Sequence, residues 1–227
     1  MTSTPTVATP SVLNGPAAAP AAALLTRIAG MALLAGAAAF FAGLLSTSAP
    51  DGDGQSAYNA AAAAHPVTYQ ISGVLLHYGN LLLGVGVLAL PALVRARRGA
   101  LLTGIGAALS ALTLVNLAGA IAIDWYNLEL GRQLPGEAGA AISDAATGHA
   151  LYQVAFTPGP FSLIGMLLLF VGLSRARAMG WWSVAGIVLG TACLILLPYE
   201  NPVLPALGVL PMLAVFAAAG IRLLRVE

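Results

Sequence analysis

The sequence predicts an all-α integral membrane protein that crosses the bilayer six times. Of its 227 residues, 59% are hydrophobic and 7% are charged, whereas a soluble domain carries about 25% charged residues. The third of six apolar stretches covers residues 101–123, which as a helix is about 35 Å long and exceeds a hydrocarbon core of about 30 Å. These runs are too long and too uniformly apolar for barrel strands, so we expect helices, which satisfy their own backbone in lipid.

Residues 1–23 are expected to form a disordered cytoplasmic tail. They are rich in Ala, Pro, Thr and Ser and carry no charge, so they cannot bury a core of their own. The first apolar stretch, 24–45, begins beside Arg27, whereas a cleaved signal peptide normally has a basic segment ahead of its apolar run. We therefore expect this helix to be retained.

The remaining apolar stretches complete a six-helix transmembrane domain over residues 24–227. Eight of the nine arginines lie in connections or ends on one side of the expected helices. The positive-inside rule makes that side cytoplasmic, and both termini lie on it in the plasma membrane. Seven of the eight acidic residues, all three histidines and Arg132 lie on the opposite side. The five later stretches lie near 70–94, 101–123, 153–174, 181–198 and 203–224.

The composition excludes several classes of function. The chain has no lysine, which rules out a retinal Schiff base and other lysine chemistry. Its net charge of +1, without a basic stripe, argues against nucleic acid as a partner. Cys193 is the only cysteine and lies in an apolar run, so it forms neither an internal disulfide nor a CxxC redox pair.

Two hairpins carry similar signals in the same order. His65 and His149 precede the second and fourth expected helices, and a Tyr and a Gln follow each of them. Each helix then runs to an Arg-Ala-Arg turn, and each returning helix ends in an acid, a Tyr and an Asn. A tandem hairpin repeat and chance similarity in a low-complexity sequence explain these matches equally well. A repeat would gather Asp124 and Glu200 around one outer vestibule.

Polar residues occupy one face on each of three neighbouring helices, at spacings of three and four residues. Antiparallel packing would set His77, Asn80 and Asn116 at a common depth, about 10 Å from the outer end. Ionisable groups at this depth usually face a cavity, which makes His77 a functional candidate. The competing interpretation is a neutral imidazole that holds two helices together by a hydrogen bond. The predicted ligand-binding residues are His77, Asn80, Asn116, Asp124, His149, Gln153 and Glu200.

The sequence offers candidate metal ligands but no metal-binding motif. His65, His77 and His149 are the candidate metal ligands, and imidazole together with carboxylate suits zinc and several other transition metals. However, no two histidines stand three or four residues apart, and there is no HExxH sequence. No motif indicates haem or another cofactor.

Three functions fit this pattern. The first is a transporter, sensor or accessory subunit that binds a small solute or cation in the outer vestibule without catalysis. The second is an intramembrane enzyme that uses His77 and Asp124 as acid and base on a lipid-like substrate. The third is a structural membrane partner whose polar residues only join helices. The expected partner is the lipid bilayer. The GxxxG sequence of Gly186 and Gly190 suits either close packing between helices of the chain or contact with a second copy through a small-residue face.

Overall fold

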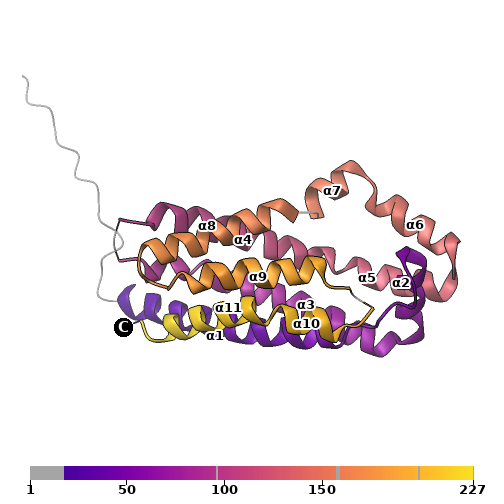
Figure 1. The fold of residues 1–227 in the computed structure, drawn as a ribbon, viewed down its shortest axis with the longest axis horizontal. Coiled ribbons are helices and arrows are strands. Elements are labelled where there is room, and N and C mark those ends of the chain that lie inside the picture. The colour runs from indigo at the N-terminus through magenta and orange to yellow at the C-terminus, as the bar shows by residue number, and fades with distance from the viewer. Residues whose placement is uncertain (1–17, 96, 157–158, 199, 227) are drawn as a thin grey trace, which may run out of the picture.

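The computed structural model describes residues 18–95, 97–156, 159–198 and 200–226, and every regular element within them is helical. The all-α prediction is therefore confirmed. Six helices lie side by side along the long axis of the molecule and form a bundle (Figure 1). They are α1 (Ala18–Leu45), α3 (Pro66–Val87), α4 (Ala100–Ala120), α8 (Gly159–Arg175), α9 (Trp182–Leu196) and α11 (Leu210–Leu224).

Several of these helices have the length and surface of membrane-spanning elements. Three described helical segments are long and apolar enough to cross a membrane: Ala21–Leu45, Pro66–Val87 and Ala100–Gln133. Helices α8, α9 and α11 are also apolar but shorter. The outer surface exposes large apolar side chains such as Leu101 and Leu112, which hydrocarbon accepts more readily than water does. These features identify a membrane protein.

The bundle core contains aliphatic and aromatic side chains from all six bundle helices. Phe170 and Phe216 are fully buried and meet edge to face, with ring centroids 5.8 Å apart. Leu33, Leu169 and Val215 are also fully buried within the same cluster. This apolar core fixes how the helices are arranged and leaves the polar residues to the two ends and to a few helix contacts.

Glycines allow close approach between helices within the chain. A Cβ atom on Gly106 of α4 would overlap the backbone of Leu169 in α8, so these two helices need a glycine at their contact. Gly186 and Gly190 of α9 both face α11. The small-residue face proposed to join two copies is therefore covered by a helix of the same chain, and contact between copies would need another surface.

The connections at one end of the bundle are helical. A helical cap forms there, at the right in Figure 1, from four short helices. Alanine-rich segments have high helix propensity, and Glu137 in the first turn of α6 and Arg132 in the last turn of α5 complement the helix dipoles. The cap helices are α2 (Gly54–Ala64), α5 (Ile123–Gln133), α6 (Glu137–Thr147) and α7 (Ala150–Phe156).

Several boundaries differ from the predicted ones. Helix α1 begins at Ala18, so the last six residues of the expected tail are helical, while residues 1–17 lie outside the described part of the chain. The expected helix over 153–174 is described as two helices, α7 and α8, and residues 157–158 between them lie outside the description. A short helix, α10 (Val203–Gly208), precedes α11.

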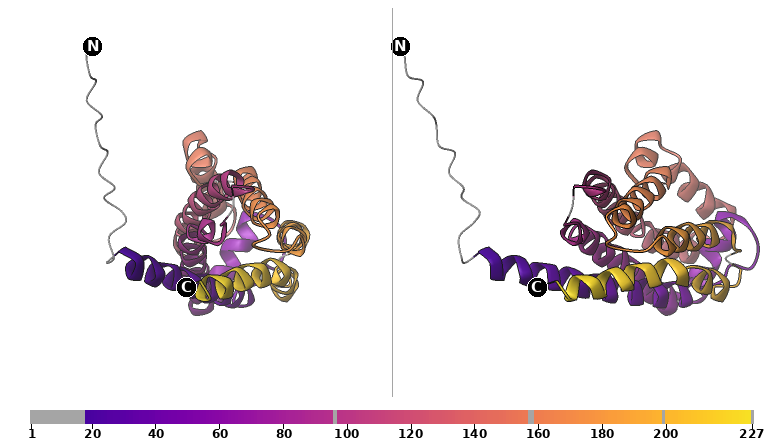
Figure 2. Two further views of the ribbon diagram at one scale, coloured as in Figure 1. Left: turned by 90° about the vertical axis from the view of Figure 1, so that its left-hand side faces the viewer. Right: turned by 60° about the vertical axis from the view of Figure 1, so that its left-hand side comes forward.

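The two ends of the bundle differ in charge. The link from α3 to α4, which includes the 3-10 helix η1 (Leu90–Leu93), lies at the end opposite the cap, as do the α8–α9 turn and the end of α11. Figure 2 looks onto this end, where the C-terminal part of α11 runs beside α1. Two surface hollows here are lined by arginines, and no carboxylate of a described residue lines either of them.

Candidate functional site

Asp124 lies at the start of α5, where the cap meets the bundle. Its Oδ1 accepts a hydrogen bond from the Tyr58 hydroxyl of α2 at 3.1 Å. Tyr69 of α3 packs edge-on against Tyr58, with ring centroids 5.7 Å apart. The buried Tyr69 hydroxyl is close enough to interact electrostatically with Asp124, but it makes no hydrogen bond of normal geometry among the described residues. Asp124 is thus held between two phenols from different helices.

A second polar cluster joins three cap helices. Gln55 donates from Nε2 to Oδ1 of Asn59 at 2.8 Å within α2. Asn59 donates to the Ser143 hydroxyl of α6 at 3.5 Å, and Ser143 donates to Oδ1 of Asn127 in α5 at 2.9 Å. Asn59, Asn127 and Ser143 are all buried. Since a buried polar group without a partner is costly, these bonds select one arrangement of the cap helices.

His77 has a structural partner at the end of α4. Its Nδ1 lies 2.8 Å from the carbonyl oxygen of Ala118, and a carbonyl only accepts, so Nδ1 carries the proton. In a continuous α-helix this carbonyl would accept from the N–H of Ala122, which instead bonds to Gly119 at 3.1 Å. The imidazole therefore satisfies a carbonyl that the break between α4 and α5 leaves without its helical partner.

Asn80 and Asn116 share this region of the bundle. Asn116 is half-buried, two residues before Ala118, so the structure places it near the depth of His77. Asn80 is 1% exposed and donates to the carbonyl of Leu76 at 2.8 Å. Its Oδ1 is buried and has no hydrogen-bond partner among the described residues. The polar face of α3 thus meets α4. His77, Asn80 and Asn116 line none of the four cavities described for this chain.

The other histidines lie on the surface of the cap. His65 is exposed between α2 and α3, and His149 is exposed between α6 and α7. The Gln153 side chain donates to the carbonyl of Thr147 at 2.7 Å, so it braces this turn. No group of three or more His, Cys, Asp or Glu side chains with metal-binding geometry occurs among the described residues.

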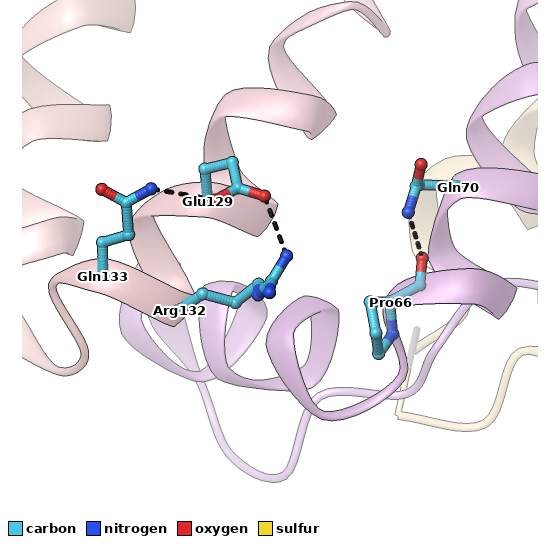
Figure 3. Close-up of polar contacts among 5 residues, drawn as sticks. All are labelled: Pro66, Gln70, Glu129, Arg132 and Gln133. Carbon is cyan, nitrogen blue, oxygen red and sulfur yellow. Dashed lines mark hydrogen bonds and ion pairs between the residues drawn. The ribbon is translucent and has the colours of Figure 1, made fainter.

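Two exposed polar clusters of the cap region are local to their own helices (Figure 3). Glu129 of α5 accepts from Arg132 at 3.1 Å and from Gln133 at 3.0 Å. Gln70, which shares a face with His77 in the sequence pattern, donates to the carbonyl of Pro66 at 3.1 Å in the first turn of α3. Each cluster stabilises turns of its own helix.

Glu200 lines a surface hollow of about 540 Å³ between the end of α1, the start of α2 and the α9–α10 connection. We call it the acidic hollow because its lining includes the carboxylates of Asp53 and Glu200 and no basic side chain. Ser48 is 7% exposed, and its hydroxyl has no hydrogen-bond partner among the described residues. The lining residues are Thr47, Ser48, Pro50, Gly52, Asp53, Gly54, Gln55, Tyr58 and Glu200.

A smaller pocket of about 290 Å³ lies on the other side of α5 and is almost wholly apolar. It opens between the α4–α5 junction, α6 and α7, and we call it the apolar pocket. Tyr126 and Tyr152 line it with Ile123, Leu130 and Ile142. Partial burial raises the pKa of the Tyr152 phenol, and the nearby charge of Asp124 raises it further. Asp124 therefore influences this pocket electrostatically from the junction.

The structure brings together only some of the predicted site residues. Glu200 lines the acidic hollow together with Tyr58, and Tyr58 donates a hydrogen bond to Asp124, which does not itself line the hollow. His149 and Gln153 lie apart from that hollow. Tyr58, Asn59 and Ser143 were not predicted from the sequence. The one available signal was that Tyr58 and Asn59 interrupt the otherwise alanine-only segment 57–64. Comparison with protein-family models, with curated proteins and with solved structures gives no match.

Proposed function

We propose that this chain is a plasma-membrane protein that binds a small organic cation in the acidic hollow. The observation that carries this proposal is the lining itself, which combines two carboxylates, an aromatic ring and a buried hydroxyl without a partner, and which has no basic side chain. Each carboxylate would attract a positively charged solute, and both would repel an anion.

The aromatic ring distinguishes an organic cation from a simple metal ion. Tyr58 is half-buried and lines the hollow, and a ring face attracts an ammonium group by about 0.5–1 kcal/mol at an exposed site. Asp53 and Glu200 are exposed, so each contributes only about 0.2–1 kcal/mol. Together these contributions reach at most about 3 kcal/mol, so a small probe such as choline should bind weakly, with a Kd of about 5–10 mM at the tightest.

Tyr58 also connects the hollow to the rest of the molecule. The hydroxyl of the same side chain bonds to Asp124 at the junction of cap and bundle. A ligand that shifts the Tyr58 ring would therefore change a contact between α2 and α5. This connection suits a sensor, an accessory subunit or the outer site of a transporter, and it requires no catalytic step.

The membrane arrangement proposed with this function has six spans, with the cap outside the cell and both termini in the cytoplasm. The arginine-rich end opposite the cap supports this orientation through the positive-inside rule. The tandem hairpin relation remains part of the proposal. His65 and His149 both precede a helix, and their carbonyls accept from Tyr69 and Gln153 at 3.0 Å in each case.

A second candidate function is binding of a lipid-like molecule in the apolar pocket. Its almost wholly apolar lining favours a hydrocarbon chain. Catalysis by a His77–Asp124 pair has less support, because His77 is bonded to Ala118 and Asp124 to Tyr58. A purely structural role is the alternative if neither cavity takes a ligand.

Thermal stabilisation of the purified chain by choline, in lipid nanodiscs, tests the proposal. Choline should raise the melting temperature of the wild type, and this shift should fall by about half or more in Asp53→Asn and Glu200→Gln. Asp51→Asn is the matched control, because Asp51 is exposed beside the hollow and does not line it. An equal shift in all four proteins, or none in the wild type, would contradict the assignment.

A further inference from the structure

At the end of the bundle opposite the cap, a hollow of about 480 Å³ gathers four arginines from three separate segments. Arg98 comes from the link before α4, Arg175 and Arg177 from the end of α8 and the turn after it, and Arg222 from α11. The lining contains no carboxylate, and none of these arginines forms an ion pair with a described residue. We call this site the arginine hollow.

The α8–α9 turn that forms one wall of the hollow is fixed by backbone hydrogen bonds. The N–H of Arg177 bonds to the carbonyl of Ser174 at 3.1 Å, and the N–H of Ala178 bonds to that of Leu173 at 2.9 Å. These two bonds are the pattern of a Schellman motif, which closes the C-terminus of a helix. The residue after the helix cap in this motif must adopt a left-handed conformation, and glycine usually occupies it.

Arginine occupies that position in this chain. Arg177 has φ of 59° and is the only non-glycine residue with positive φ in the described part of the chain. A bulky side chain is unfavourable in this conformation, and such residues persist where the surroundings or a function require them. Since the Arg177 side chain lines the hollow, a binding role for its guanidinium accounts for the absence of glycine.

Other contacts hold the turn in place behind the arginines. Ser183 is fully buried and donates to the carbonyl of Gly180 at 2.8 Å, and Ser174 donates to the same carbonyl at 3.2 Å. Arg222 donates from Nη1 to the carbonyl of Ala178, which joins α11 to the turn. These hydrogen bonds fix the backbone of the α8–α9 turn, which carries Arg177, and the contact from Arg222 joins the turn to α11.

The position of the hollow favours a lipid as its occupant. The exposed side chain of Trp181 forms part of the lining, with 60% of its surface accessible, and tryptophan is typical of the boundary between membrane and water. A neighbouring hollow of about 400 Å³ shares Arg222 and adds Arg95 and Arg225. Basic pockets between helix ends at this boundary bind the phosphates of anionic lipid headgroups.

We infer that the arginine hollow binds the phosphate of an anionic phospholipid headgroup, with Arg177 retained in a left-handed conformation for this contact. The site is separate from the acidic hollow, so its test does not depend on the proposed function. Arg177→Gly separates the charge from the fold, because glycine adopts the left-handed conformation without strain while the guanidinium is removed.

The experiment measures binding of dioctanoyl-phosphatidylglycerol to the full chain in phosphatidylcholine nanodiscs, alongside thermal unfolding. Arg177→Gly should weaken binding by about fivefold, as expected for one arginine at a membrane surface, while its melting temperature stays level or rises. Arg27→Ala is the control, because Arg27 is exposed on α1 and lines neither hollow. It should bind like the wild type.

Three outcomes would overturn the inference. The first is equal binding by Arg177→Gly and Arg27→Ala, which would indicate a diffuse charge effect. The second is equal affinity for dioctanoyl-phosphatidylcholine, which lacks the net negative charge. The third is complete displacement of the lipid by inorganic phosphate at millimolar concentration, which would assign the hollow to free phosphate instead.

Discussion

Tyr58 of α2 donates a hydrogen bond to Asp124 of α5 at 3.1 Å, and the same side chain lines the acidic hollow. This single residue joins a surface cavity to the junction where the cap meets the bundle. The ring of Tyr69, from α3, packs against Tyr58 at 5.7 Å. Three helices therefore meet around one half-buried carboxylate.

Removal of the Tyr58 hydroxyl should loosen this junction. Tyr58→Phe keeps the ring and deletes the donor to Asp124, so we expect a loss of about 1–2 kcal/mol in the free energy of unfolding, because hydrogen bonds to charged groups are worth somewhat more than neutral ones. Thermal unfolding in detergent measures the effect. Tyr126→Phe is the control, since Tyr126 is 73% exposed on α5. Equal melting temperatures for the two variants would contradict this account of the junction.

The packing of α2 on α5 depends on a glycine. A Cβ atom on Gly131 would overlap the carbonyl oxygen of Asn59, so Gly131→Ala should cost about 1–3 kcal/mol through overpacking. A Cβ atom on Gly104 of α4 would meet no other atom within 4 Å. Gly104→Ala should therefore leave the free energy of unfolding unchanged or raise it by up to about 1 kcal/mol, because alanine has the higher helix propensity. Unfolding of both variants in the same detergent checks the contrast, and the account fails if Gly131→Ala is the more stable of the two.

Two substitutions distinguish the hydrogen bond that His77 makes from the space that its ring fills. Asn places an amide nitrogen near the position of Nδ1, so His77→Asn should keep the bond to the Ala118 carbonyl, whereas His77→Phe leaves that carbonyl without a partner. We expect His77→Phe to be less stable by about 1–3 kcal/mol than the wild type, and His77→Asn to lie between them. Thermal unfolding again measures this. If His77→Phe is as stable as the wild type, the bond is not what retains the histidine.

The sequence predicted the bundle well because the signals for it are coarse and repeated. Long apolar runs marked α1, α3 and α4 to within a few residues at most ends. The arginines of two connections and of the end of α11 lie together at one end of the structure. Such features depend on averages over many residues. A few exceptional positions do not change them.

The cap was not predicted, because its helices are short and only partly apolar. Helices α2, α5 and α6 have 11 residues each, so they are too short to be recognised as membrane-spanning runs. Their stability comes from tertiary contacts such as the bond between Ser143 and Asn127. Contacts of this kind join residues distant in sequence, and no local pattern reveals them.

The candidate site shows the same limit at the level of single residues. Periodicity correctly placed His77 on the face of α3 that meets α4, but it could not identify the backbone carbonyl that the imidazole contacts. His149, one of the predicted ligand-binding residues, does not line the acidic hollow. Tyr58, which lines the hollow and bonds to Asp124, is a lone aromatic residue in an alanine-rich segment and carries no motif.

The proposed orientation is open to a direct labelling test. In a Cys193→Ala background, Glu137→Cys places the only thiol on α6 of the cap, and Arg98→Cys places it at the arginine-rich end. A membrane-impermeant maleimide added to intact cells should label the first variant and should label the second only after permeabilisation. The reverse pattern would invert the proposed topology.

The acidic hollow is the centre of the account, and its preference for positive charge is the property to measure. Isothermal titration of the nanodisc-embedded chain with choline, and with its uncharged isostere 3,3-dimethyl-1-butanol, compares two ligands of nearly the same shape. Two carboxylates and the Tyr58 ring should favour choline by about tenfold. Equal affinity for the two ligands, or tighter binding of the neutral one, would contradict a cation site and would favour an apolar ligand instead.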